Sequence, residues 1–425
     1  MKSTSFYYNC EFCNYATSHT SHYKRHLLSF HPNEYNSFLN NEMTTANKKQ
    51  LFIVKKTDIN PISHDKTSSK NESKINHDEH NITFIPSNES SKDLIRNIFD
   101  NTNHLNKSDV SLSNFNWRTN KILSCGSFST AYLGEDINNG VKVIILQTNL
   151  DNEEDINYKK YILNKIQGLG NFPPLYDILY FGDYCYLVEG LMGFDLKTLF
   201  KLCDKKFDLI TTLNIGIDVI KNLKILHEAG FIHRDLKPDN LVFGPLCEEN
   251  IKYKNDIGIL DFGNSKFLKK KNGSINYTSK FYKCRGNRMF SSSNALLDID
   301  TTPYDDIEST FYILIYFLNG SLPWKSKSSE KKIDKKEIVE IRKKLGPSEL
   351  CANFPKQFID LFKQIVDRNL NDQPDYKNII INFELMIDDS YIYNDSNEYK
   401  FKWIKIFKEV IINPNTDIDK DKKKK

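Results

Sequence analysis

Two short motifs bring together side chains that could move a phosphoryl group. They are His233-Arg-Asp-Leu-Lys-Pro-Asp-Asn240 and Asp261-Phe-Gly263. Phosphoryl transfer needs a group that orients the acceptor hydroxyl, a cation near the moving phosphate, and oxygen ligands for Mg²⁺. Asp235 can accept the hydroxyl proton, Lys237 can supply the cation, and Asn240 and Asp261 can hold the metal. Because an apolar strand leads into the second motif, polar turn residues on another fold explain the match poorly.

Four possible metal ligands near the N-terminus have the spacing of a small zinc site. The pattern is Cys10-x2-Cys13-x12-His26-x4-His31. Two thiolates from a hairpin and two imidazoles one helical turn apart can close a tetrahedron around Zn²⁺. Since so small a segment has no adequate core, the metal would supply most of its folding free energy. The alternative is four unrelated residues in a polar tail.

Composition limits the remaining classes of function. The chain has 59 Lys and Arg against 55 Asp and Glu, so its net charge of +4 excludes a polycation, and any nucleic-acid contact should be local. The longest apolar run, Phe311–Leu318, is far shorter than the ~18 residues of a membrane span. Apart from Cys10 and Cys13 the cysteines are single and scattered, which is typical of reduced thiols. We therefore expect an intracellular protein with no membrane contact, and leave nucleus versus cytoplasm open.

Composition and apolar periodicity also divide the chain into stretches. Residues 6–33 hold the expected zinc module, and residues 40–109 form a polar linker with too few apolar residues to order itself. One short helix is expected inside this linker, at 93–99. Sustained periodicity predicts a folded domain over 115–390, and residues 391–425 form an extension with a lysine-rich end.

Within the folded domain, strand signals precede helix signals. Strands are predicted at Ala131–Leu133, Val141–Leu146 and Tyr184–Val188, with a hairpin turn at Asn138-Asn-Gly140, and helices are predicted from Leu213 and over Ile307–Leu318. Strands first and helices later predict an α+β, two-lobed domain. His227, on the apolar face of the first helix, is interpreted as a core histidine.

With these motifs the chain resembles the protein-kinase superfamily, in particular the casein kinase I and vaccinia-related kinase group, over roughly 115–387. Besides the two motifs, the resemblance is carried by Gly126-Ser-Phe128, Tyr132-Leu-Gly134, Gln167-Gly168, Gly182-Asp-Tyr184, Lys206-Phe207, Asp305-Asp-Ile-Glu-Ser309 and Gly320-Ser-Leu-Pro-Trp324. It implies ATP and Mg²⁺ as cofactors, protein substrates, and Ser/Thr specificity through Lys237. It also implies that Gly126, Ser127 and Phe128 line the nucleotide, and that Asp306 anchors the catalytic-loop backbone from a buried helix.

The zinc module is similar to the C2H2 zinc-finger family over residues 8–31. Thr17 and Tyr23 replace the usual Phe and Leu at two of that family's core positions. One such finger covers only about 3 bp, so we expect no tight sequence-specific binding from it alone. Its partner is left open between a nucleic acid and another protein.

The nucleotide site departs from the kinase pattern at the strand lysine. Leu146 occupies the place of the lysine that holds the α/β-phosphates, and Lys159 occupies that of its glutamate partner. Lys142 shares a strand face with Leu146, but four residues put it roughly 13 Å away, too far for a simple substitute. Glu189 falls at the usually apolar position behind the nucleotide. One hypothesis pairs Lys159 with Glu189 and lets Lys159 reach the phosphate, and the other points Lys159 to solvent and shifts Val188 into that position.

Together these features predict a Ser/Thr protein kinase tethered by a linker to a zinc finger, which would raise the local concentration of the kinase at a partner. One rival is a pseudokinase scaffold, because losing the phosphate-gripping lysine removes much of the electrostatic positioning. Against that rival, an idle site has little reason to keep its base, cation and metal ligands together. The other rival is a nucleic-acid-binding regulator whose function depends on residues 1–40 and not on Asp261.

Overall fold

The computed structural model describes residues 8–9, 16–17, 111–112, 115–125, 129–244, 256–268, 287–325, 333–368, 373–393, 400–404 and 406–407. The linker predicted at 40–109, with its helix at 93–99, lies outside the described residues, as does the lysine-rich end. By its contacts the chain divides into two compact units. No described helix is long and apolar enough to cross a membrane.

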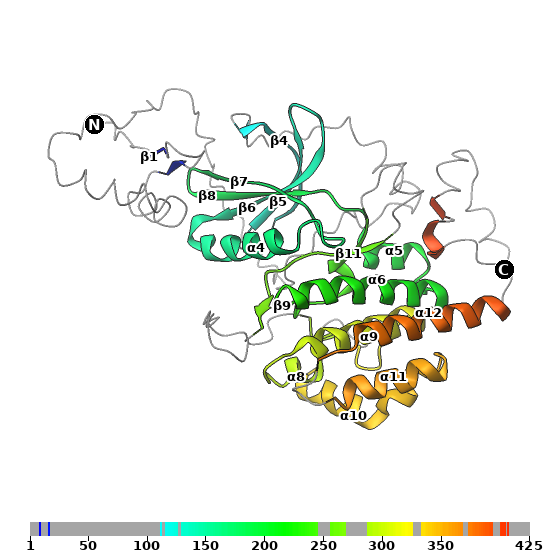
Figure 1. Cartoon of the computed structure of the whole chain (residues 1–425). Helices are drawn as coiled ribbons and strands as arrows, with labels where there is room; N and C mark the ends of the chain where they lie inside the picture. Colours follow the sequence, from blue (N-terminus) through cyan, green and yellow to red (C-terminus); the bar gives the residue numbers. More distant parts are fainter. Residues whose placement is uncertain are drawn as a thin grey trace, which may run out of the picture. The chain divides into compact units, whose positions relative to one another are not determined.

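The first unit is built on a six-stranded sheet in the order β3-β4-β5-β6-β8-β7 (Figure 1). The strands are β3 (Ser111–Leu112), β4 (Trp117–Cys125), β5 (Ser129–Asp136), β6 (Lys142–Asn149), β7 (Leu175–Phe181) and β8 (Tyr184–Gly190). β5 pairs antiparallel with β4 and β6, and β6 pairs antiparallel with β8. The three strands predicted from sequence are therefore confirmed. β5 and β8 extend beyond their predicted residues, and β6 begins one residue later and ends three residues later than predicted.

The hairpin between β5 and β6 confirms the turn predicted at Asn138-Asn-Gly140. Gly140 has φ 73°, a left-handed conformation that glycine adopts without a Cβ clash. Asp136 Oδ1 accepts a hydrogen bond from the Asn138 N–H (2.8 Å), and Asn139 Oδ1 accepts one from Val141 N–H (2.9 Å). These short side chains satisfy the backbone of the turn and so fix the register of β6.

The second unit is mainly helical. Its helices are the C-terminal half of α4 (Glu153–Ile166), α5 (Leu196–Leu202), α6 (Leu209–Glu228), η3 (Pro238–Asn240), α8 (Ser293–Leu296), α9 (Pro303–Asn319), α10 (Lys335–Leu350), α11 (Lys356–Val366) and α12 (Tyr376–Tyr393). Two short antiparallel pairs complete it, β10 (Leu241–Phe243) with β11 (Ile257–Ile259), and β9 (Phe231–Ile232) with β12 (Lys266–Phe267). A sheet unit followed by a helical unit is the α+β fold class expected from the sequence.

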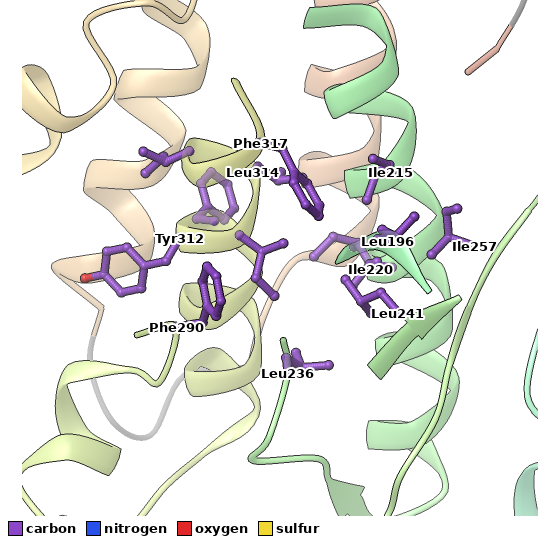
Figure 2. Close-up of a cluster of buried hydrophobic side chains, with 14 of the residues drawn as sticks. Leu196, Ile215, Ile220, Leu236, Leu241, Ile257, Phe290, Tyr312, Leu314 and Phe317 are labelled. Atoms are coloured by element: carbon purple, nitrogen blue, oxygen red, sulfur yellow. The ribbon is translucent and has the colours of Figure 1, made fainter. Parts of the chain in front are cut away.

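A single buried cluster holds the second unit together (Figure 2). α6 packs against both α9 and α12, so its apolar side chains face neighbours on more than one side. The cluster contains side chains from α5, α6, α9, β10, β11 and the loops between them, among them Leu196, Ile215, Ile220, Leu236, Leu241, Ile257, Phe290, Tyr312, Leu314 and Phe317. Leu236 anchors the loop of the first motif in this cluster, and Phe290 anchors a segment that precedes α8.

Helix α9 confirms the helix predicted over Ile307–Leu318 and begins a turn earlier. Thr302 and Asp305 form a reciprocal capping box, and Pro303 occupies the first turn, where its missing N–H has no intrahelical partner. The helix ends at Asn319, and the next residue, Gly320, caps it in a left-handed conformation with φ 82°. These caps lie outside the apolar pattern, which explains why the pattern alone gave a shorter helix.

Helix α6 likewise begins at Leu209, one turn before the predicted Leu213. Asp208 provides its N-cap, since the carboxylate accepts a hydrogen bond from Thr211 N–H (2.7 Å).

A short segment after α12 also belongs to the core of the second unit. Phe401, Trp403, Ile404 and Phe407 are all buried. Trp403 packs against the rings of Phe207, Phe243 and Phe401. The folded part of the chain therefore continues at least to residue 407.

Candidate functional site

The backbone of the first motif is held by one buried carboxylate on α9. Asp306 accepts hydrogen bonds from His233 N–H (2.6 Å) and Arg234 N–H (2.8 Å). Arg234 has φ 71°, a conformation that a non-glycine residue keeps only when its surroundings hold it there. The arrangement confirms the anchor expected at Asp306.

His227 orients this carboxylate and is the core histidine that the sequence predicted. Because the Asp306 carboxylate can only accept, His227 Nε2 donates to it (2.9 Å) and Nδ1 accepts from the Tyr376 hydroxyl (2.7 Å). Burial acts to raise the pKa of Asp306, but the hydrogen bonds that His227 and the Arg234 N–H donate to the carboxylate act in the other direction, and the pKa lies below its ordinary value. The carboxylate therefore stays ionised beneath the catalytic loop.

Asp235 is the central group of the loop. Its Oδ2 lies 3.1 Å from Lys237 Nζ and accepts a longer hydrogen bond from Asn264 Nδ2 (3.3 Å). Its backbone carbonyl accepts from Asn240 Nδ2 (2.8 Å). Its Oδ1 is buried and has no hydrogen-bond partner among the described residues. Oδ2 is thus held by Lys237 and Asn264, and Oδ1 can accept a hydrogen bond from a donor that is not among the described residues.

Burial and charge act against each other at Asp235. Burial raises its pKa, the Lys237 ammonium lowers it, and the nearby Asp261 carboxylate raises it again, so that the pKa lies above its ordinary value. At Lys237 burial lowers the pKa, but the charges of Asp235 and Asp261 more than compensate, and the pKa is raised. Lys237 therefore remains a cation.

The second motif is tied to the first through the backbone. Leu260 N–H donates to the Asn240 carbonyl (2.8 Å), so β11 delivers Asp261 beside the loop. Asp261 has φ 62°, and its Oδ1 accepts from Gly263 N–H (3.2 Å). Phe262 is fully buried and packs edge-on against the His233 ring. The four residues that the sequence singled out, Asp235, Lys237, Asn240 and Asp261, are therefore gathered in one unit.

Sequence reasoning missed Asn264, although it follows the second motif directly. Sequence reasoning also missed Arg368, which holds the carboxylates of Asp305 and Glu308, each at 2.8 Å. Glu308 Oε1 in turn accepts from the N–H (2.9 Å) and hydroxyl (3.0 Å) of Ser293 at the start of α8. Arg368 lies 60 residues after Glu308, so no local pattern could have signalled this contact.

In the first unit, strand register decides which side chains share a face with Leu146. Leu146 pairs with Leu187 across β6 and β8, and Ile144 pairs with Glu189, so Glu189 and Leu146 lie on one face. Val188 lies on the opposite face, in the cluster that contains Ile145. The register therefore places Glu189, and not Val188, on the sheet face of Leu146.

The structure describes only some of the other residues that were expected to be near the nucleotide. Lys142 Nζ lies 2.5 Å from Glu135 Oε2. Lys159 lies on α4 and is half-buried. Gly126, Ser127 and Phe128 lie outside the described residues.

The four expected zinc ligands, Cys10, Cys13, His26 and His31, also lie outside the described residues. What is described there is one antiparallel pair, β1 (Tyr8–Asn9) with β2 (Ala16–Thr17). Elsewhere in the described part of the chain, no three His, Cys, Asp or Glu side chains gather as a metal site.

In a comparison with known protein families, residues 117–382 match the protein kinase domain. This range covers strands β4 to β8 of the sheet in the first unit, both motifs, and the second unit into α12. The carboxylate beneath the loop, the base with its neighbouring lysine, and the second motif beside them all lie within it. The chain belongs to the protein kinase family.

Proposed function

We propose that the chain is an ATP-dependent Ser/Thr protein kinase of the casein kinase I and vaccinia-related kinase type, with Asp235 as the base. The observation that carries this proposal is the carboxyl of Asp235, whose Oδ2 is held by Lys237 and Asn264 while Oδ1 is buried without a partner among the described residues. A buried acceptor left unpaired is costly. A substrate hydroxyl donating to Oδ1 removes that cost and is oriented for attack.

The donor set fits Mg²⁺, which a protein kinase domain uses together with ATP. Asp261 offers a carboxylate, and the amide of Asn240 has its nitrogen engaged by the Asp235 carbonyl, which leaves Oδ1 as its acceptor. When bound, the metal neutralises charge on the phosphate oxygens. We assign Asn240 and Asp261 as its ligands.

The remaining groups of the loop act on protons and charge. Asp235 receives the hydroxyl proton of the polypeptide at Oδ1. Lys237 stays cationic and stabilises negative charge beside the acceptor, and its presence two residues after the base supports Ser/Thr rather than Tyr specificity. Because the pKa of Asp235 is raised, transfer should fall as the pH drops and the base becomes protonated.

On the nucleotide side we propose that Gly126, Ser127 and Phe128 approach the phosphates and that Lys159 replaces the missing strand lysine. The apolar Leu146 and the buried Glu189 on one sheet face support a rearranged charge pattern there. The variant Lys159→Met should weaken ATP binding, and the matched variant Lys160→Met on the same helix should not. Equal ATP affinity in the two variants would show that Lys159 does not contribute to ATP binding.

We further propose that residues 6–33 form a zinc finger that brings the kinase to a nucleic acid or protein. The antiparallel pairing of β1 with β2 supports a hairpin of the kind that carries two thiolate ligands. The purified chain should contain one zinc per molecule by mass spectrometry, and Cys10→Ser with Cys13→Ser should contain none. Equal zinc content in both would contradict the proposal.

A pseudokinase is the second candidate, and the observation that favours it is Leu146. An apolar side chain on this face of β6 offers nothing to a phosphate. Transfer of labelled phosphate from Mg-ATP to a mixed protein substrate decides between the two, with Asp235→Asn as the blank. We expect the native chain to transfer phosphate and Asp235→Asn to transfer none. Equal amounts of labelled product from both would show that the chain is a pseudokinase.

A further inference from the structure

Helix α10 contributes a buried arginine whose role the two motifs do not explain. Arg342 is only 5 % exposed. Its guanidinium carbon lies 3.9 Å from the centre of the Tyr312 ring on α9 and 4.5 Å from that of the Trp324 ring. A planar cation stacked on two rings keeps its N–H groups free to donate in its own plane.

Those N–H groups hold the segment that precedes α8. Arg342 Nη1 donates to the Ser291 carbonyl (2.7 Å), and Nη2 makes a longer bond to the Met289 carbonyl (3.4 Å). The same Met289 carbonyl accepts from Trp324 Nε1 (2.7 Å). The cation and one of its stacking rings thus bind the same short piece of backbone.

The segment Asn287–Ser292 is anchored to the core and is exposed at Arg288. Phe290 is buried against the Tyr316 ring, and the Ser291 hydroxyl donates to the Asn287 carbonyl (2.6 Å). Arg288, between them, is exposed. The carbonyls of Met289 and Ser291 point to Arg342, the side chains of Phe290, Ser291 and Ser292 are buried, and those of Asn287 and Met289 are partly exposed.

This segment and the catalytic loop are anchored in one buried cluster. Phe290 and Leu236, the residue after Asp235, belong to the same buried cluster (Figure 2). Phe290 packs against the ring of Tyr316. The pKa of Tyr316 is raised by burial and also by the nearby carboxylate of Asp239 in the catalytic loop. The segment Asn287–Ser292 and the loop that holds Asp235 are therefore anchored in the same core of the second unit.

We propose that Arg342 is a positioning residue for the polypeptide substrate, acting by clamping Asn287–Ser292 beside the catalytic loop. The inference rests on the proposed kinase function and adds to it the surface that receives the substrate chain. A lysine cannot replace the arginine fully, because it lacks the planar fork and the stacking faces.

The first test is amide hydrogen exchange on Arg342→Met and Arg342→Lys, with Lys343→Met as the matched control on the exposed side of α10. In Arg342→Met the exchange of Asn287–Ser292 should rise about tenfold or more, as expected for lost charge-assisted hydrogen bonds, while α6 and α9 keep their protection. Arg342→Lys should lie between, and Lys343→Met should match the native chain. Unchanged exchange in the segment, or faster exchange throughout the unit, overturns the clamp.

The second test measures substrate binding without requiring catalysis. In an Asp235→Asn background, the affinity for a fluorescent pool of Ser/Thr-containing peptides should fall about tenfold with Arg342→Met, and the affinity for Mg-ATP should not change. If affinities for peptide and Mg-ATP fall together, or if no variant binds the peptide pool, the positioning role is wrong. Failure of the native chain to transfer phosphate would instead contradict the proposed function, and the binding result would still decide the role of Arg342.

Discussion

Replacing Trp403 by alanine tests whether the segment after α12 is part of the kinase fold. The family match ends at residue 382, yet Trp403 is fully buried in the second unit. It stacks on Phe401 with the ring centres 4.6 Å apart, and lies 5.2 Å from Phe207 and 5.7 Å from Phe243. Phe243 ends β10, the strand that directly follows the catalytic loop.

The expected loss follows from this packing. Truncating a buried Trp or Phe to Ala removes about 3–5 kcal/mol of unfolding free energy, through lost burial and the cavity left behind. Because three aromatic neighbours lose their contacts, each such pair adding about 0.5–1.5 kcal/mol, we expect the upper part of that range, about 4–5 kcal/mol. Against a total stability of about 5–15 kcal/mol, this leaves the second unit close to unfolding.

The measurement is urea unfolding followed by circular dichroism at the helical band, which reports the second unit. Trp403→Phe serves as one control, since it keeps an aromatic ring and removes an Nε1–H that has no acceptor among the described residues, so it should lose less than half as much. Leu385→Ala on α12 is the other, because Leu385 is 55 % exposed and its truncation should be nearly neutral. A midpoint for Trp403→Ala equal to that of Leu385→Ala would refute the reasoning.

Two further predictions concern buried charges. Burial raises the pKa of Asp195 to about 6, so the folded chain binds an extra proton below that pH, and its stability falls as pH rises from about 4 to 6. The variant Asp195→Asn keeps the hydrogen bond that caps Thr198 N–H. It should stabilise the chain by up to about 3 kcal/mol at pH 8 but not at pH 4. Equal unfolding midpoints of the variant and the native chain at pH 8 would contradict this prediction. Arg368→Met leaves the buried carboxylates of Asp305 and Glu308 without their shared cation and should lose about 3–5 kcal/mol in urea unfolding at neutral pH. A loss below about 1 kcal/mol would mean that the two carboxylates are satisfied without it.

Much of the site could be predicted because it is local. Asp235, Lys237 and Asn240 lie within six residues of one another, so their spacing already fixes which groups meet, and the strand before Asp261 is a short apolar run. The strands of the sheet and the hairpin turn were predicted for the same reason, since alternation and turn residues act over a few positions. The boundaries of α6 and α9 were less accurate, because Asp208 and the Thr302 capping box lie outside the apolar pattern.

The sequence by itself determined the chemistry available to this chain, namely a base, a lysine and two oxygen ligands in fixed order along the backbone. Only the tertiary structure decided how those groups are held: Asp306 beneath the loop, Asn264 on the base, Arg368 on two carboxylates, and Arg342 on the segment before α8. Each of these contacts joins residues that are far apart in the chain. They result from the packing of α9, α10 and α12 around one core. The free energy of that packing is the sum of many small contributions from buried apolar surface, and no short stretch of sequence contains them all.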